Sequence, residues 1–222
     1  MARVIIDRLT LQDGVLSCND RTGKPHPAFK KQGDLDGACA TYSVIMSLLM
    51  LGVIYDHDTQ VYSKPKDWHT RRLINTFLCY NGMHHQGQSF IKIRKMLLES
   101  FGSKVSCTRR ATTNEASVDV ITEILDSGLP VVMSVIWPGG GHAMVAVGYE
   151  HVGGEVTRIL CLDPSGKVPA NRHWNAEVRL DTGSSNSKYK YLYSNGVGDD
   201  LDVSLDDLLI IDRLKSHISA EK

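Results

Sequence analysis

Apolar residues between positions 38 and 53 recur near helical spacing, which predicts a mostly buried helix over that segment. Asn114 is a good N-cap and Gly128 suits the position after a helix end, so the two residues frame another helix over 114–127. The same criteria predict two further helices, at 67–80 and 88–101. We therefore expect the first half of the chain to be mainly helical.

The second half contains the continuous apolar runs that are typical of buried strands. Such runs cover 130–136, 142–149 and 156–162, and Gly153-Gly154 provides a turn between the last two. Because only this short turn separates them, the last two strands are predicted to lie close together in space.

Shorter or less regular segments complete the prediction. Residues 1–16 alternate loosely and indicate a short strand with a turn at Asp13-Gly14, whereas the polar segment 17–37 predicts a loop. Segment 204–214 predicts a short helical turn that runs into a final strand. The remaining predictions are strands at 104–109 and 188–193 and a polar connection at 181–188. Helices followed by strands predict an α+β fold with a largely antiparallel sheet, in a single domain over 1–222.

Charge and hydropathy exclude several classes of function. Lys plus Arg and Asp plus Glu both number 25, so the net charge is zero and no overall basic field attracts nucleic acid. The longest apolar run, 44–54, contains Ser47 and Gly52 and is too short to span a bilayer. The N-terminus has no apolar stretch of signal-peptide length. We expect a cytoplasmic protein, or an effector exported without a cleaved signal peptide.

Among the cysteines, Cys39 has the setting of a nucleophile. The odd number of cysteines and the absence of CxxC pairs argue against a disulfide framework and favour a reducing compartment. Cys39 begins a predicted helix and has small neighbours, and a helix N-terminus with a nearby imidazolium lowers a thiol pKa from about 8.5. The four cysteines without this setting are Cys18, Cys79, Cys107 and Cys161.

A thiolate nucleophile needs a base and a group that orients the base. His142 follows three glycines and opens a predicted strand, and Asp163 ends the next apolar strand. If the two strands form an antiparallel hairpin, the start of the first lies beside the end of the second, which brings His142 and Asp163 together. The pattern therefore predicts a catalytic set of Cys39, His142 and Asp163.

Acyl transfer also needs hydrogen-bond donors for the developing oxyanion. The backbone N–H of Cys39 is one candidate, and the side-chain amide of Gln32, seven residues upstream, is the second. No cofactor is expected. No metal is expected either, since the possible zinc ligands do not have the spacing of a zinc site. These possible ligands are His69, Cys79, His84 and His85.

The segments that carry the candidate residues resemble the papain-like cysteine peptidase superfamily. They are QGDLDGACATYS at 32–43, GHAMVAVGY at 141–149 and LDPSG at 162–166. The order Gln, Cys, His, Asp and the short hairpin between His and Asp look most like the bacteriocin leader-peptidase (double-glycine peptidase-like) branch. The resemblance implies a papain-like fold, in which a helical lobe (about 30–128) with the nucleophile helix packs on an antiparallel sheet lobe (about 129–215).

Three functions fit these residues. The first is a cysteine protease that hydrolyses a peptide or isopeptide bond in a protein or peptide substrate through a thioacyl-enzyme. The second is a deamidase or acyltransferase that uses the same site. The third is a papain-like binding module that does not catalyse, which an intact Cys, His and Asp set argues against. Fold and catalytic set do not name the substrate, and the oligomeric state stays open.

Overall fold

One helix of the molecule is apolar on almost all sides and almost completely buried. A computed structural model describes residues 1–33, 37–59, 67–79, 88–112, 114–182 and 188–214. The described residues contain four α-helices, which are α1 (Cys39–Met50), α2 (Trp68–Cys79), α3 (Phe90–Phe101) and α4 (Glu115–Asp126). Ten of the twelve residues of α1 are buried, because its sequence is apolar on almost all sides.

Every strand pair in the described residues is antiparallel. A small sheet contains β2 (Leu9–Gln12), β3 (Val15–Asn19) and β4 (Pro25–Pro27). The large sheet contains β1 (Ala2–Ile5), β5 (Val105–Ala111), β6 (Val131–Trp137), β7 (Gly140–Val152), β8 (Glu155–Leu162), β9 (Ala176–Arg179), β10 (Tyr191–Ser194) and β11 (Leu201–Arg213).

The large sheet closes on itself. Its order is β1-β7-β6-β11-β10-β9-β8, with β5 on β11, and β8 pairs in addition with β7. Six strands therefore form a closed ring in the order β7, β6, β11, β10, β9 and β8. Closure places the end of β8 near β10, although the two segments lie far apart in the sequence.

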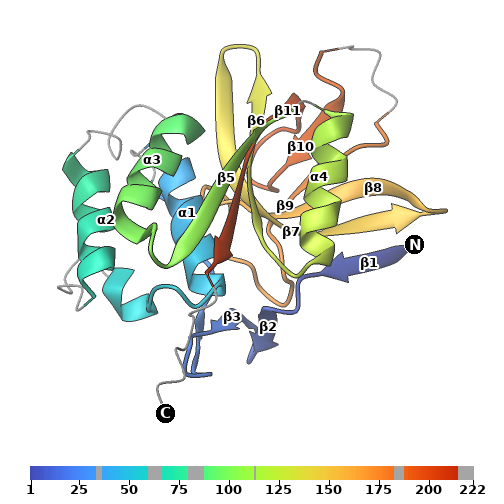
Figure 1. Ribbon diagram of the computed structural model, residues 1–222. Helices are drawn as coiled ribbons and strands as arrows, with labels where there is room; N and C mark the ends of the chain where they lie inside the picture. The colour runs from blue at the N-terminus through green and yellow to red at the C-terminus, as the bar shows by residue number, and fades with distance from the viewer. Residues whose placement is uncertain (34–36, 60–66, 80–87, 113, 183–187, 215–222) are drawn as a thin grey trace.

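The helices pack on this ring from two sides. Figure 1 shows α1, α2 and α3 together on one side of the molecule, while α4 lies against the sheet. The α1 helix packs on β6 and β7, α3 packs on β5, and α4 contacts β7 and β11. Helices and sheet share one cluster of buried apolar side chains. Within the described part of the chain, no helix is long and apolar enough to cross a membrane.

Most elements lie where the apolar pattern predicts them. The α+β class and the antiparallel sheet are confirmed, and the predicted helices and the strands predicted from apolar runs begin and end within three residues of the observed bounds. The turn at Asp13-Gly14 joins β2 and β3, and both residues have positive φ. The division into lobes near residue 128 stays a prediction; β1 and β5, which precede it, both pair with strands that follow it.

Two predictions are wrong in part, and one strand is absent from the prediction. Segment 204–214 contains no helical turn, because β11 is extended over its whole length and pairs with β6 and β5. A register shift between Leu205 and Leu208 takes up one extra residue of β11, so strand pairing outweighs local preference. The loop predicted over 17–37 includes the end of β3 and all of β4. The prediction lacks β9, and residues 183–187 of the predicted polar connection lie outside the described residues.

Candidate active site

Cys39 is the first residue of α1. Ala38 precedes it at the N-cap and makes no side-chain capping hydrogen bond, so the N–H groups of the first turn are available to other acceptors. The N–H of Ala40 donates to the Cys39 sulfur, and so does the N–H of Ala143 in β7, at 3.4 Å. Backbone donors from a helix and from a strand therefore converge on this sulfur.

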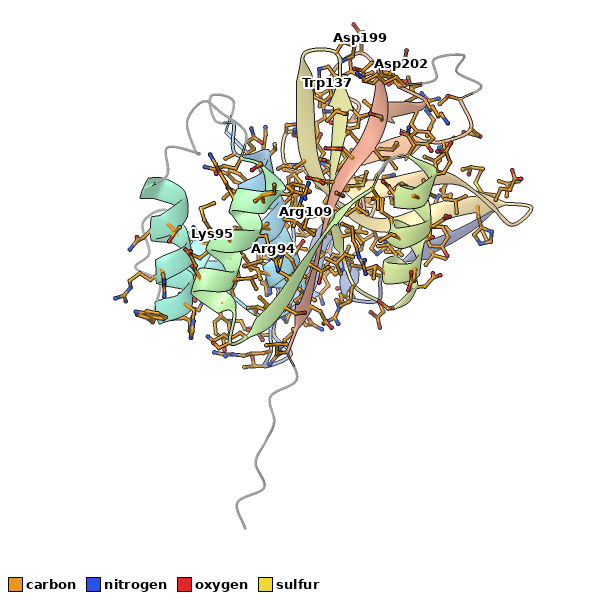
Figure 2. The ribbon with its side chains drawn as sticks, turned by 45° about the horizontal axis from the view of Figure 1, so that its top comes forward. Arg94, Lys95, Arg109, Trp137, Asp199 and Asp202 are labelled. Atoms are coloured by element: carbon orange, nitrogen blue, oxygen red, sulfur yellow. The ribbon has the colours of Figure 1, made fainter. Side chains whose placement is uncertain are left out.

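His142 lies near the start of β7, just after the tip of the β6–β7 hairpin, and pairs with Val135. Trp137 ends β6, and Figure 2 shows it near the end of this hairpin. A Cβ atom on Gly140 would lie 2.6 Å from Nε1 of Trp137, so the indole ring packs directly on the glycine. Because Gly140 has no side chain, the Trp137 ring can pack at the tip of the β6–β7 hairpin. Gly140 lies only two residues before His142.

The predicted hairpin between β7 and β8 is present, and it aligns His142 with Asp163. Val145 is opposite Leu162, so the same register places Asp163 opposite Met144, on the same side of the strand as His142. Nε2 of His142 donates to Oδ1 of Asp163 at 2.5 Å. This leaves Nδ1 as the ring nitrogen for the hydrogen bond between His142 and Cys39.

The carboxylate of Asp163 is fully buried, and several donors surround it. Oδ2 accepts hydrogen bonds from the hydroxyl of Tyr193 and, at 3.1 Å, from Nδ2 of Asn195. Oδ1 accepts hydrogen bonds at 2.8 Å from both the backbone N–H and the hydroxyl of Ser165. These bonds replace the water that an ionised carboxylate loses on burial.

The backbone of Asp163 is held as firmly as its side chain. Oδ1 of Asn175 accepts the Asp163 N–H at 2.7 Å, and Nδ2 of Asn175 donates to the Asp163 carbonyl oxygen at 2.8 Å. Burial raises the pKa of the Asp163 carboxyl, but His142, Tyr193 and Asn195 together hold this pKa well below its usual range. Asp163 is therefore ionised at neutral pH.

The thiol and the imidazole shift each other's pKa in opposite directions. Burial raises the pKa of Cys39, but the hydrogen bond and charge of His142, with the N–H groups of Ala143 and Ala40, bring this pKa below its usual value. Burial lowers the pKa of His142, whereas hydrogen bonds to Asp163 and Cys39 and the charges of both raise it to about 10. The arrangement therefore favours a thiolate paired with an imidazolium.

Gln32 lies beside the turn that follows Asp163. Its backbone N–H donates to the carbonyl oxygen of Pro164 at 2.8 Å. Residues 34–36, which connect this segment toward α1, lie outside the described residues. The structure thus places the backbone of Gln32 next to the pair of His142 and Asp163.

The other cysteines with described side chains lie in surroundings that disfavour a thiolate. Burial raises the pKa of Cys18 to about 12 and that of Cys107 to about 11, and it also raises the pKa of Cys161. The side chain of Cys79 and residues His84 and His85 lie outside the described residues. Within the part of the chain that is described, no three His, Cys, Asp or Glu side chains form a group that could hold a metal ion.

Four residues that bind Asp163 are absent from the sequence prediction of the site: Ser165, Asn175, Tyr193 and Asn195. Ser165 lies within the LDPSG segment, so its proximity to Asp163 was open to sequence reasoning. Tyr193 and Asn195 lie at the end of a strand more than 25 residues further along the chain. No local pattern marks them.

Comparisons with known proteins identify no family for this chain. No protein-family model matches it, and no curated protein matches it. Among solved structures it is similar to that of UfSP from C. elegans, with a TM-score of 0.44 and 18% sequence identity. The match covers 86% of this chain and 33% of that chain, so this chain spans about a third of the length of that protein.

We predict that Tyr193→Phe raises the pKa of the Asp163 carboxyl, because the ionised carboxylate loses a donor. Loss of a hydrogen bond to a buried charge also lowers the free energy of unfolding, by about 1.5–3 kcal/mol. NMR titration of the Asp163 carboxyl and chemical denaturation measure the two effects.

Tyr191→Phe is the matched control, because Tyr191 is buried on the same strand and makes no hydrogen bond to a carboxylate in the described part of the chain. Equal changes of the Asp163 pKa in the two variants would contradict the assignment of Tyr193 as a donor to Asp163.

Proposed function

We propose that the protein is a papain-like cysteine protease, with Cys39 as nucleophile, His142 as base and Asp163 as the group that orients the base. The observation that carries the proposal is the chain of contacts from Sγ of Cys39 through the imidazole to a buried carboxylate. The lowered pKa of Cys39 supports it further, since thiolate rather than thiol attacks a carbonyl carbon.

In the proposed reaction, the Cys39 thiolate attacks the carbonyl carbon of the scissile bond, and the carbonyl electron pair moves onto oxygen. Collapse of this intermediate expels the amine, which takes the proton from Nδ1 of His142, and leaves a thioester on Cys39. The imidazole, now neutral, accepts a proton from water as the water attacks the thioester. The C–S bond then breaks, which releases the carboxylic acid and restores the Cys39 thiolate beside the imidazolium. Asp163 keeps the ring oriented and stays ionised throughout.

The oxyanion is proposed to bind at the start of α1. The backbone N–H of Cys39 is the first donor, and the helix N-terminus adds a favourable field. We assign the side-chain amide of Gln32 as the second donor. The hydrogen bond between the Gln32 backbone and Pro164 supports this assignment, because it holds the segment beside the proposed site.

A deamidase or acyltransferase would use the same thioester, so the substrate and the acceptor decide among these reactions. A peptidase transfers the acyl group to water after releasing a backbone amine. A deamidase releases ammonia from a side chain, and an acyltransferase passes the acyl group to a second molecule. A binding module that does not catalyse would not need the lowered pKa of Cys39.

We predict that Cys39 is alkylated by iodoacetamide well below the ordinary thiol pKa, because His142 and two N–H groups stabilise its thiolate. His142→Ala removes the imidazolium, so the pH at which the alkylation rate rises should move upward. Peptide mapping across a pH series measures the rate for each cysteine. Faster labelling of Cys18, Cys107 or Cys161 than of Cys39 at neutral pH would count against the proposal.

Mass spectrometry of candidate substrates distinguishes the reactions. With the wild-type protein we expect backbone or isopeptide cleavage, and with Cys39→Ala we expect none, because the nucleophile is absent. A side-chain change of about one dalton with an intact backbone would instead identify a deamidase. Turnover that persists in Cys39→Ala would exclude the proposed mechanism.

Gln32→Ala tests the second oxyanion donor. Loss of one donor costs about 2.7–4 kcal/mol of transition-state stabilisation, so kcat should fall by roughly a hundred- to a thousandfold while KM changes little. Alkylation of Cys39 should stay fast, because the thiolate does not depend on this amide. Near wild-type turnover in Gln32→Ala would place the second donor elsewhere.

A further inference from the structure

A cavity of about 400 Å³ opens beside β9 and β10, and the proposed catalytic residues do not line it. Its wall includes Asn175 and Asn195, the two amides that bind Asp163. Lys167, Arg172 and Trp174, on the connection between β8 and β9, also line it. The volume lies within the range of about 300–1,000 Å³ that is usual for sites of small ligands.

The cavity carries uncompensated positive charge. Within the described residues, neither Lys167 nor Arg172 forms an ion pair, and both side chains are exposed. The carboxylate in the wall, Glu177, lies 3.3 Å from a guanidinium nitrogen of Arg158 and 3.8 Å from one of Arg179, so its charge is balanced. The two free cations therefore favour an anionic ligand.

Apolar and amide groups surround these cations. The guanidinium groups of Arg3 and Arg172 lie over the Trp174 ring, 4.5 and 5.8 Å from its centroid, and Val168, which is 61% exposed, lines the same cavity. Both N–H groups of Asn175 already donate to carbonyl oxygens of Asp163 and Lys167, whereas Asn195 uses one N–H for Asp163 in the described residues and can donate the other to a peptide carbonyl. A ligand that matches all three features has a carboxylate, an apolar portion and backbone amides, which is the chemistry of an acidic peptide segment.

We propose that this cavity binds an acidic segment of a polypeptide, with Lys167 and Arg172 holding a Glu or Asp carboxylate and Trp174 packing against a neighbouring side chain. The binding does not depend on the chemistry at Cys39, so it can be measured on a protein without the nucleophile. Because Asn175 and Asn195 line the cavity and also hold Asp163, a bound segment lies directly beside the proposed active site.

The test uses full-length Cys39→Ala protein and two capped peptides of the same length, acetyl-Val-Glu-Glu-Val-amide and its Gln counterpart. Calorimetry should show binding of the Glu peptide about tenfold tighter than that of the Gln peptide, since only the former offers charge-assisted hydrogen bonds. Adding Lys167→Gln and Arg172→Gln together should remove this preference. Both side chains are exposed, so an unchanged thermal midpoint is expected and excludes unfolding as the cause.

Lys95→Gln is the control for loss of a surface cation. Lys95 is 77% exposed on α3, on the helical side of the molecule and away from β9 and β10 (Figure 2). Its substitution should leave the preference for the Glu peptide intact. Equal affinity for the two peptides, or a preference that survives Lys167→Gln with Arg172→Gln, would overturn the proposal. Inorganic phosphate that binds as tightly as the Glu peptide would also overturn it, by showing a simple anion site.

Discussion

Asp163 has an ionised carboxylate with no exposed surface, and removing such a charge from water is unfavourable unless hydrogen bonds and opposite charge replace the lost solvent. The adjacent turn supplies Ser165, the end of β10 supplies Tyr193 and Asn195, and β7 supplies His142. These groups meet only because β8, β9 and β10 are successive neighbours in a closed ring of strands. The geometry of the sheet and the ionisation of this carboxylate therefore depend on each other.

The contact between the helical part and the sheet determines the ionisation of the Cys39 thiol. Cys39 comes from the start of α1, and its sulfur meets the N–H of Ala143 and the imidazole of His142 on β7. A second backbone hydrogen bond, from Gln32 to Pro164, ties the segment before α1 to the turn after β8. Because α1 is almost completely buried against β6 and β7, the sulfur is held at a fixed place relative to the strands. The lowered pKa of Cys39 is thus a property of this packing and not of the helix alone.

Charged side chains are unevenly distributed around the proposed site. The net charge is zero, yet two cations without ion-pair partners in the described residues lie at the cavity beside Asn175 and Asn195. The same amides hold Asp163. If an acidic peptide segment binds there, as we propose, then recognition and the proposed chemistry share their supporting residues. A change at either amide would affect both.

A local hydrophobic pattern is enough to predict the buried helix α1, the central strands and the hairpin of β7 and β8. The proximity of His142 and Asp163 could be predicted because a tight turn at Gly153-Gly154 leaves one simple pairing for the two strands. No local pattern identifies Tyr193 and Asn195 as partners of Asp163, and the local pattern at the end of the chain favours a helical turn where β11 is extended. These features depend on which distant strands become neighbours when the sheet closes. Periodicity along the chain shows which side of an element is buried, but the residues that cover this side come from elements far apart in the sequence and follow from how those elements pack.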